Sequence, residues 1–263
     1  MTISQPTARG FAKLQEHLPA LKSPFGWAGL LALPVLLFVF IGAFFAIEDI
    51  AGGGWLLDGE VVILTLGFLS LSLFFKLKKQ LRERFATRAY AIGFTRFVAP
   101  GLAVIVAVIV RMRFIGGPRI PQLLTIPILT VLGWLLLVIG LVLWLRAVRA
   151  LGIDSLTMTY VYYPREGEFA QHAIYQLIRH PIYAAAQCIA YGLALLNGSW
   201  FALTLALIFS LEMWGWVRLV EEKELIERFG EPYAAYCRQV PAFWPQPSAL
   251  GRFLKFLLGG KTA

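Results

Sequence analysis

Long apolar runs separated by charged clusters dominate the pattern along this chain. Four of them, alone or with their flanks, are long enough to cross a bilayer: 26–47, 55–75, 89–110 and 121–145. Each meets the length of about 20 apolar residues that a membrane-spanning helix needs. The third is the weakest, because its continuous apolar part begins only at Phe97.

A further apolar stretch, 181–210, is too long for one straight crossing at about 1.5 Å rise per residue. Asn197, Gly198 and Ser199 form a turn signal in its middle. We therefore interpret it as two antiparallel helices. The chain is predicted to be all-α, a bundle of about six transmembrane helices ending in a helical hairpin.

Amphipathic segments are predicted near both termini. Between residues 9 and 22, Phe11, Leu14, Leu18 and Leu21 recur at helical spacing, which is typical of a helix on the membrane surface. A frayed tail is an equally good interpretation. We divide the chain into an N-terminal interfacial part (1–25), N-terminal transmembrane helices (26–150), a core (151–246) and a C-terminal interfacial tail (247–263).

Composition agrees with a membrane protein. Apolar residues make up 59% of the chain and the mean hydropathy is +0.71, above the roughly 45–50% apolar content of soluble domains. The net charge of +9 lies in short clusters between apolar runs, which argues against nucleic-acid binding. Cys188 and Cys237 have no spacing suited to a metal, so we predict neither a metal site nor a disulfide framework.

The basic clusters predict an orientation. The strongest one, 76–88, is expected to be cytoplasmic by the positive-inside rule. This places both termini and the 146–180 stretch inside as well, and the acidic 48–60 loop outside, in what we expect to be the cytoplasmic membrane. Arg111, Arg113 and Arg119 do not fit, so either the third segment is re-entrant or the rule is broken locally.

Candidate chemistry concentrates in the last third of the chain. Arg179 and His180 precede Pro181, which suits the first turn of a helix. Tyr183, Gln187 and Tyr191 then follow at intervals of four residues on one helix face. An arginine anchor with an aromatic belt would explain these residues equally well.

Acidic residues follow the hairpin. Arg218 and Glu222 are one turn apart and are expected to pair. Glu212 lies inside an apolar helix, where a carboxylate is costly and is either functional or a partner for a cation. We predict a cationic partner for Glu212, such as Arg179.

The order of these pieces resembles a known family. Arg179-His180-Pro181-Ile182-Tyr183, a helical hairpin, Glu221-Glu222, Phe229-Gly230, Tyr233, Tyr236 and Val240-Pro241 are similar to the core of the isoprenylcysteine carboxyl methyltransferase family, which membrane phospholipid methyltransferases share. The resemblance covers roughly residues 151–245. Ala173 and Ala185 stand where the family often has another small residue, and Arg218 does not align cleanly with the family's essential arginine.

The resemblance implies an S-adenosylmethionine-dependent enzyme, with the cofactor held by the motif before the hairpin and the acidic pair after it. The implied cofactor-binding residues are Tyr175, Arg179, His180, Pro181, Tyr183, Tyr191, Glu221 and Glu222, and the implied catalytic residues are Arg179, Arg218 and Glu222. A cation and an anion suit the cofactor's carboxylate and ammonium, and aromatic faces suit its sulfonium.

The predicted reaction is methyl transfer to a lipophilic acceptor, with the bilayer as the acceptor's route. A prenylated cysteine, a phospholipid amine, an isoprenoid acid and a small thiol all remain open as acceptors. Two other functions also remain open. The C-terminal run Tyr233 to Pro241 resembles that of membrane sterol reductases, which use NADPH, and a non-enzymatic transporter would share the apolar pattern.

Overall fold

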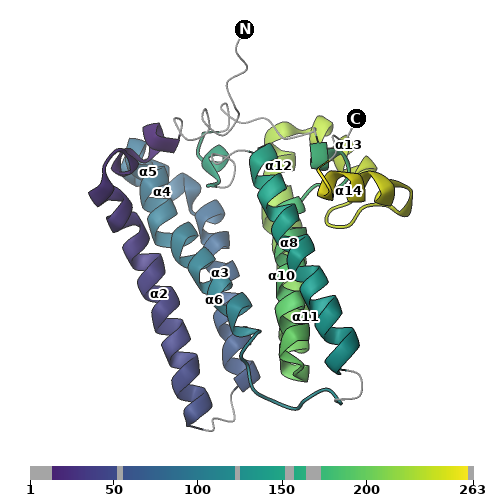
Figure 1. Cartoon of the computed structure of the whole chain (residues 1–263). Coiled ribbons are helices and arrows are strands. Elements are labelled where there is room, and N and C mark those ends of the chain that lie inside the picture. The colour runs from purple at the N-terminus through teal and green to yellow at the C-terminus, as the bar shows by residue number, and fades with distance from the viewer. Residues whose placement is uncertain (1–13, 52–55, 122–124, 152–156, 164–172, 260–263) are drawn as a thin grey trace.

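The protein is a bundle of long helices standing side by side (Figure 1). The computed structural model describes residues 14–51, 56–121, 125–151, 157–163 and 173–259, and this part of the chain contains no β-strand. The helices are α2 Pro24–Ile50, α3 Leu56–Lys76, α4 Lys78–Phe85, α5 Ala89–Gly93, α6 Ala99–Arg111, α8 Thr130–Leu151, α10 Pro181–Asn197, α11 Trp200–Trp216, α12 Glu222–Phe229, α13 Glu231–Gln239 and α14 Leu250–Leu257. The predicted all-α fold is confirmed.

Five helical runs are long and apolar enough to cross a membrane: Pro24–Ile50, Leu57–Lys76, Lys78–Arg111, Pro127–Leu151 and Trp200–Phe229. With α10, which packs on α8 and α11 along their length, about six crossings result. The third run is continuous because a π-helical segment, Phe94–Val98, joins α5 to α6. The predicted third segment therefore has the form of a full crossing.

Helices α8 and α10 approach closely along a seam of small residues. A Cβ added to Gly192 would lie 2.9 Å from the carbonyl oxygen of Gly133 and 3.0 Å from the backbone nitrogen of Leu137. A Cβ on Gly140 would lie 2.9 Å from the carbonyl oxygen of Ala185. Small residues let transmembrane helices gain dispersion contacts that lipid would otherwise supply. This seam sets the position of α10, which begins at the candidate site.

A buried ionic cluster joins α2, α3 and α6 at the other end of the bundle. Both terminal nitrogens of Arg111 donate to Asp49, and Nε donates to Oε1 of Glu60 at 2.6 Å. The Arg111 guanidinium also lies over the ring of Phe45. These contacts explain why an arginine at this end departs from the expected charge distribution: its charge is neutralised inside the protein.

The turn of the helical hairpin lies at the same end of the bundle as the Arg111 cluster, and side-chain hydrogen bonds fix it there. The side-chain amide of Asn197 donates to the carbonyls of Met112 and Ile115 at 3.0 and 2.9 Å. Arg119 donates to the carbonyl and the side-chain oxygen of Asn197. Gly198 takes a left-handed conformation with φ of 74° and ends α10. The predicted turn is thus confirmed, and Arg119 forms its hydrogen bonds at this turn.

The N-terminal segment is described from Leu14 onward. Residues 1–13, including Phe11, lie outside the described residues. Leu14, Leu18 and Leu21 are almost fully buried in the protein core. Their apolar face packs on the bundle. At the other terminus, α14 buries Phe253 and Phe256 and exposes Leu250 and Leu254, as an interfacial helix would.

Candidate active site

The Arg179-His180 pair lies where the chain enters α10. Pro181 occupies the first turn of that helix, as predicted. The backbone N–H of Arg179 donates to the carbonyl of Pro241 at 2.9 Å, and that of His180 donates to Ala242 at 2.8 Å. The segment after α13 is therefore paired to the motif before α10, although some sixty residues separate them.

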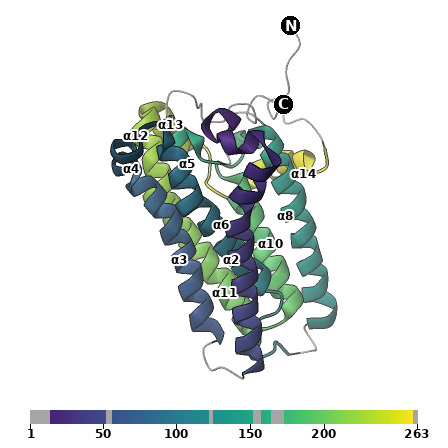
Figure 2. The ribbon, with the colours of Figure 1, turned by 90° about the vertical axis from the view of Figure 1, so that its left-hand side faces the viewer.

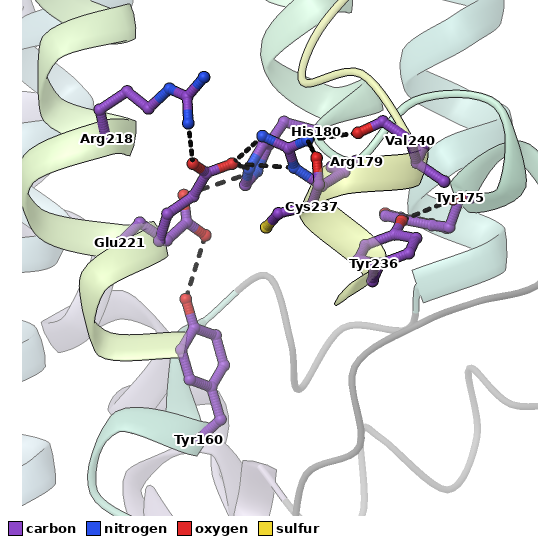
Figure 3. A network of polar contacts seen from close by, with 10 residues as sticks. Tyr160, Tyr175, Arg179, His180, Arg218, Glu221, Tyr236, Cys237 and Val240 are labelled. Atoms are coloured by element: carbon purple, nitrogen blue, oxygen red, sulfur yellow. Dashed lines mark hydrogen bonds and ion pairs between the residues drawn. The ribbon is translucent and has the colours of Figure 1, made fainter. Parts of the chain in front are cut away.

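A carboxylate binds both side chains of the pair (Figure 3). Oε1 of Glu222 accepts hydrogen bonds from Nε and Nη2 of Arg179 at 2.9 and 2.5 Å, and it lies 3.1 Å from Nε2 of His180. Nη1 of Arg179 donates to the carbonyls of Cys237 and Val240. All three guanidinium nitrogens of Arg179 are thus engaged within the protein.

The neighbouring Glu221 is less completely bonded. Its Oε1 accepts a hydrogen bond from the Tyr160 hydroxyl at 3.2 Å, while its Oε2 has no hydrogen bond and lies 3.8 Å from Nδ1 of His180. Burial and the charge of Glu221 raise the pKa of Tyr160, which keeps that phenol protonated as a donor. Glu221 ends a π-helical turn, Val217–Glu221, a feature that often marks functional sites.

Arg218 is the half-exposed member of the ionic cluster. Its side chain is 51% exposed, whereas that of Arg179 is 3% exposed. Nη1 of Arg218 donates to Oε2 of Glu222 at 3.2 Å. The predicted pairing of Arg218 with Glu222 is confirmed, and Glu222 links the buried arginine to the half-exposed one.

Aromatic rings form a wall next to the two glutamates. The rings of His180 and Tyr183 stack at 5.6 Å, and Tyr183 meets Trp216 edge to face at 5.9 Å. The ring of Phe243 is tilted relative to that of His180, with 5.9 Å between the ring centroids. These faces are supplied by α10, α11 and the segment after α13.

Two further polar atoms of this region are buried without a hydrogen-bond partner: the Tyr175 hydroxyl and Nε1 of Trp216. Burial raises the pKa of Tyr175, with the charge of Glu221 contributing, so the phenol stays protonated. Unsatisfied buried polar groups are costly and rare in folded proteins. Together with Oε2 of Glu221, these atoms can bond a polar ligand in this region.

The predicted partnership of Glu212 with Arg179 is wrong. Oε1 of Glu212 accepts a hydrogen bond from Thr65 of α3 at 2.7 Å, whereas Arg179 binds Glu222. Glu212 lies nearly three turns before Glu222 along the same helical run, deeper in the membrane-spanning part. Tyr191 likewise lies two turns beyond Tyr183 on α10.

Sequence reasoning missed several members of the cluster. Tyr160 carries no motif, and it reaches Glu221 from a short helical turn, Thr159–Val161. The carbonyls of Cys237 and Val240 act through the backbone, which leaves no side-chain signal. Tyr236, whose hydroxyl donates to the carbonyl of Tyr175 at 2.5 Å, was part of the resemblance, and the structure supplies its contact.

The fold and this cluster define a class: a multi-pass helical membrane protein with a buried ionic and aromatic site at one end of its bundle. The family model for phospholipid methyltransferase matches residues 128–232. The predicted resemblance to the membrane methyltransferases of this family is thus confirmed over that part of the chain. A search of curated proteins and a search of solved structures found no match.

Proposed function

We propose that this protein transfers a methyl group from S-adenosylmethionine to a lipophilic acceptor, at the cluster formed by α10, α11, α12 and the segment after α13. The observation that carries the proposal is the set of buried, unbonded polar atoms beside an aromatic wall: Tyr175 hydroxyl, Trp216 Nε1 and Glu221 Oε2. The match to a methyltransferase family supports the same reaction class.

The donor set suits the charges of this cofactor. Glu221 is the anion with an unbonded oxygen, so it suits the cofactor's ammonium. Arg218 is the half-exposed cation and suits a carboxylate, either of the cofactor or of the acceptor. The faces of Tyr183 and Trp216 suit a sulfonium through cation–π attraction.

Arg179 and Glu222 take a positioning role in this proposal. Their hydrogen bonds are made to each other, to His180 and to backbone carbonyls. They hold α12 against the start of α10, so that Glu221 and Tyr183 face the same space. The sequence prediction that Arg179 binds the cofactor carboxylate directly would require this guanidinium to leave partners that it already has.

The cofactor supplies an activated methyl group, and the chain's own residues align and shield the transfer. Arg218 orients an anionic acceptor, and the rings of Tyr183, Trp216 and Phe243 exclude water. A carboxylate acceptor is already ionised and needs orientation alone, whereas an amine or thiol also needs a base. We further propose that the site opens to the cytoplasm, since the basic 76–88 segment lies at the same end of the bundle.

Binding measurements on the detergent-solubilised full chain test the cofactor site. Glu221→Gln keeps the shape of the side chain and removes its charge, so we expect S-adenosylmethionine affinity to fall at least tenfold, or about 1.4 kcal/mol. Glu231→Gln is the matched control, because Glu231 is exposed and pairs with Arg238 on α13. Unchanged affinity in Glu221→Gln, or thermal stabilisation of the wild type by NADPH and not by S-adenosylmethionine, would refute the proposal.

Transfer of a labelled methyl group identifies the acceptor. The wild type is incubated with labelled S-adenosylmethionine and either total membrane lipids or prenylcysteine analogues. Label in an ester would indicate a carboxylate acceptor, and label on an amine or thioether would indicate the other classes. No label in any lipid fraction, with cofactor binding intact, would contradict a lipophilic acceptor.

A further inference from the structure

An apolar groove lies between α2 and α6, nearer to the end of the bundle at which the candidate site lies. Its cavity has a volume of about 550 Å³. The lining includes Leu31 and Val35 of α2, Leu102 and Val106 of α6, and Leu14 and Leu18 of the N-terminal segment. Thr157 also belongs to the lining, and Nε1 of Trp27 donates a hydrogen bond to the carbonyl of Leu21.

The groove is separate from the methyltransferase site. Apart from Thr157, its lining residues precede the segment that matches the family, and none belongs to the ionic cluster. In Figure 1, α2 stands at one edge of the bundle, with α3 and α6 between it and the helices α10 and α11 that carry the site. In Figure 2, which is turned by 90°, α2 lies in front of α6. A lipid in the groove is therefore not placed to accept a methyl group.

The groove opens sideways toward the region that membrane lipid occupies. Leu31 and Val35 are 49% and 54% exposed, and Leu102 and Val106 are 39% and 48% exposed. These residues lie on runs long and apolar enough to span a membrane. A hydrocarbon chain can therefore enter laterally, without crossing a polar layer.

A groove of this size does not stay empty. Its lining atoms would lose dispersion contacts, and an apolar cavity gives water too few hydrogen-bonding partners. A linear hydrocarbon chain supplies the missing contacts. All of the lining residues except Thr157 are apolar, so the acyl chain is the part of a lipid that fits the groove.

We propose that the groove binds one acyl chain of a resident phospholipid, distinct from the methyl acceptor. The acyl chain lies between α2 and α6 and packs against α2. The protein itself covers little of this helix, since only 11% of its apolar stretch is buried. The lipid is thus a structural ligand of the N-terminal helices. This inference does not depend on the methyl-transfer reaction.

Photo-crosslinking of the full chain in nanodiscs tests the proposal. The probe is a phosphatidylglycerol with a diazirine in one acyl chain, and cross-linked peptides are located by mass spectrometry. We expect cross-links to concentrate on α2 residues 27–38 and α6 residues 99–106. Ala103→Trp fills the groove and should lower the cross-link yield there at least fivefold, whereas Ala32→Trp, exposed on α2 and outside the lining, should leave it unchanged.

Native mass spectrometry provides a second readout that does not depend on a variant. The wild type, purified in mild detergent, should retain about one phospholipid per chain, and Ala103→Trp should not. Cross-links spread evenly over all lipid-facing helices, or equal lipid retention by wild type and Ala103→Trp, would overturn the proposal. Cofactor binding is expected to be unchanged in Ala103→Trp, which separates failure here from failure of the proposed function.

Discussion

Two adjacent glutamates of the site differ in their bonding. Glu222 binds Arg179, His180 and Arg218, whereas Glu221 keeps one oxygen without a hydrogen bond. The sequence shows the two as equivalent, since both follow the hairpin and both belong to the family pattern. Their roles separate only when the contacts of each oxygen are known. Glu222 then organises the site, and Glu221 is the residue with bonding capacity to offer a ligand.

At Glu222, loss of the charge should destabilise the fold. Glu222→Gln leaves the guanidinium of Arg179, with a side chain 3% exposed, without its counter-ion. Breaking a buried ion pair from one side costs about 3–5 kcal/mol, so the thermal unfolding temperature should fall markedly.

Arg218→Ala is the informative comparison, because it removes a half-exposed partner of the same carboxylate. Such a pair contributes below about 1 kcal/mol, so its unfolding temperature should stay close to that of the wild type. Equal destabilisation by the two variants would contradict the separation of a buried organising pair from an exposed binding arginine.

At the scale of helices, a seam of small residues holds α8 against α10. Gly192 faces backbone atoms of Gly133 and Leu137, which cannot rotate away as a side chain can. Gly140 makes the same kind of approach to the carbonyl of Ala185. Because α10 begins at Pro181, directly after Arg179 and His180, the seam also fixes the position of the site along the axis of α8.

Gly192→Ala should destabilise the bundle. The added Cβ would lie 2.8 to 3.0 Å from atoms of α8, and overpacking of this kind costs about 1–3 kcal/mol. Gly29→Ala on α2 is the matched control, since a Cβ added there would have no neighbouring atom within 4 Å. Thermal unfolding in the same nanodiscs should show a loss for Gly192→Ala and none for Gly29→Ala.

The sequence predicts local elements well and long-range partners poorly. The helical hairpin followed from Asn197-Gly198-Ser199, and the start of α10 followed from Pro181, because both signals act within a few residues. The predicted partner of Glu212 was wrong, because its actual partner, Thr65, lies 147 positions away on α3. Arg111 was a misfit for the same reason: its carboxylates come from α2 and α3.

At the scale of the whole molecule, charge distribution predicts the orientation of the bundle. The basic segment Lys76 to Arg88 and the candidate site lie at one end, and the cluster of Arg111, Asp49 and Glu60 lies at the other (Figure 1). With Arg111 neutralised and Arg119 bonded to Asn197, two of the three misfitting arginines are accounted for. The positive-inside rule then favours a cytoplasmic site.

Labelling of introduced cysteines from each side of the membrane checks this orientation. In a Cys237→Ser background, in which the remaining Cys188 is buried, Lys79→Cys should react with a membrane-impermeant maleimide only in inverted vesicles, because Lys79 belongs to the basic segment. Arg113→Cys, exposed at the other end, should react only from the outside of intact cells. Labelling of both positions from the same side would contradict the proposed crossing of α6.

The backbone pairing of Arg179 and His180 with Pro241 and Ala242 has a consequence for how the protein is divided into units. The stretch that matches the family ends at residue 232, yet the carbonyls that complete the arginine's bonding lie at Cys237 and Val240. The piece that relatives share is thus shorter than the piece that must fold together. Any excision made at the family boundary would leave a buried cation without two of its four hydrogen bonds.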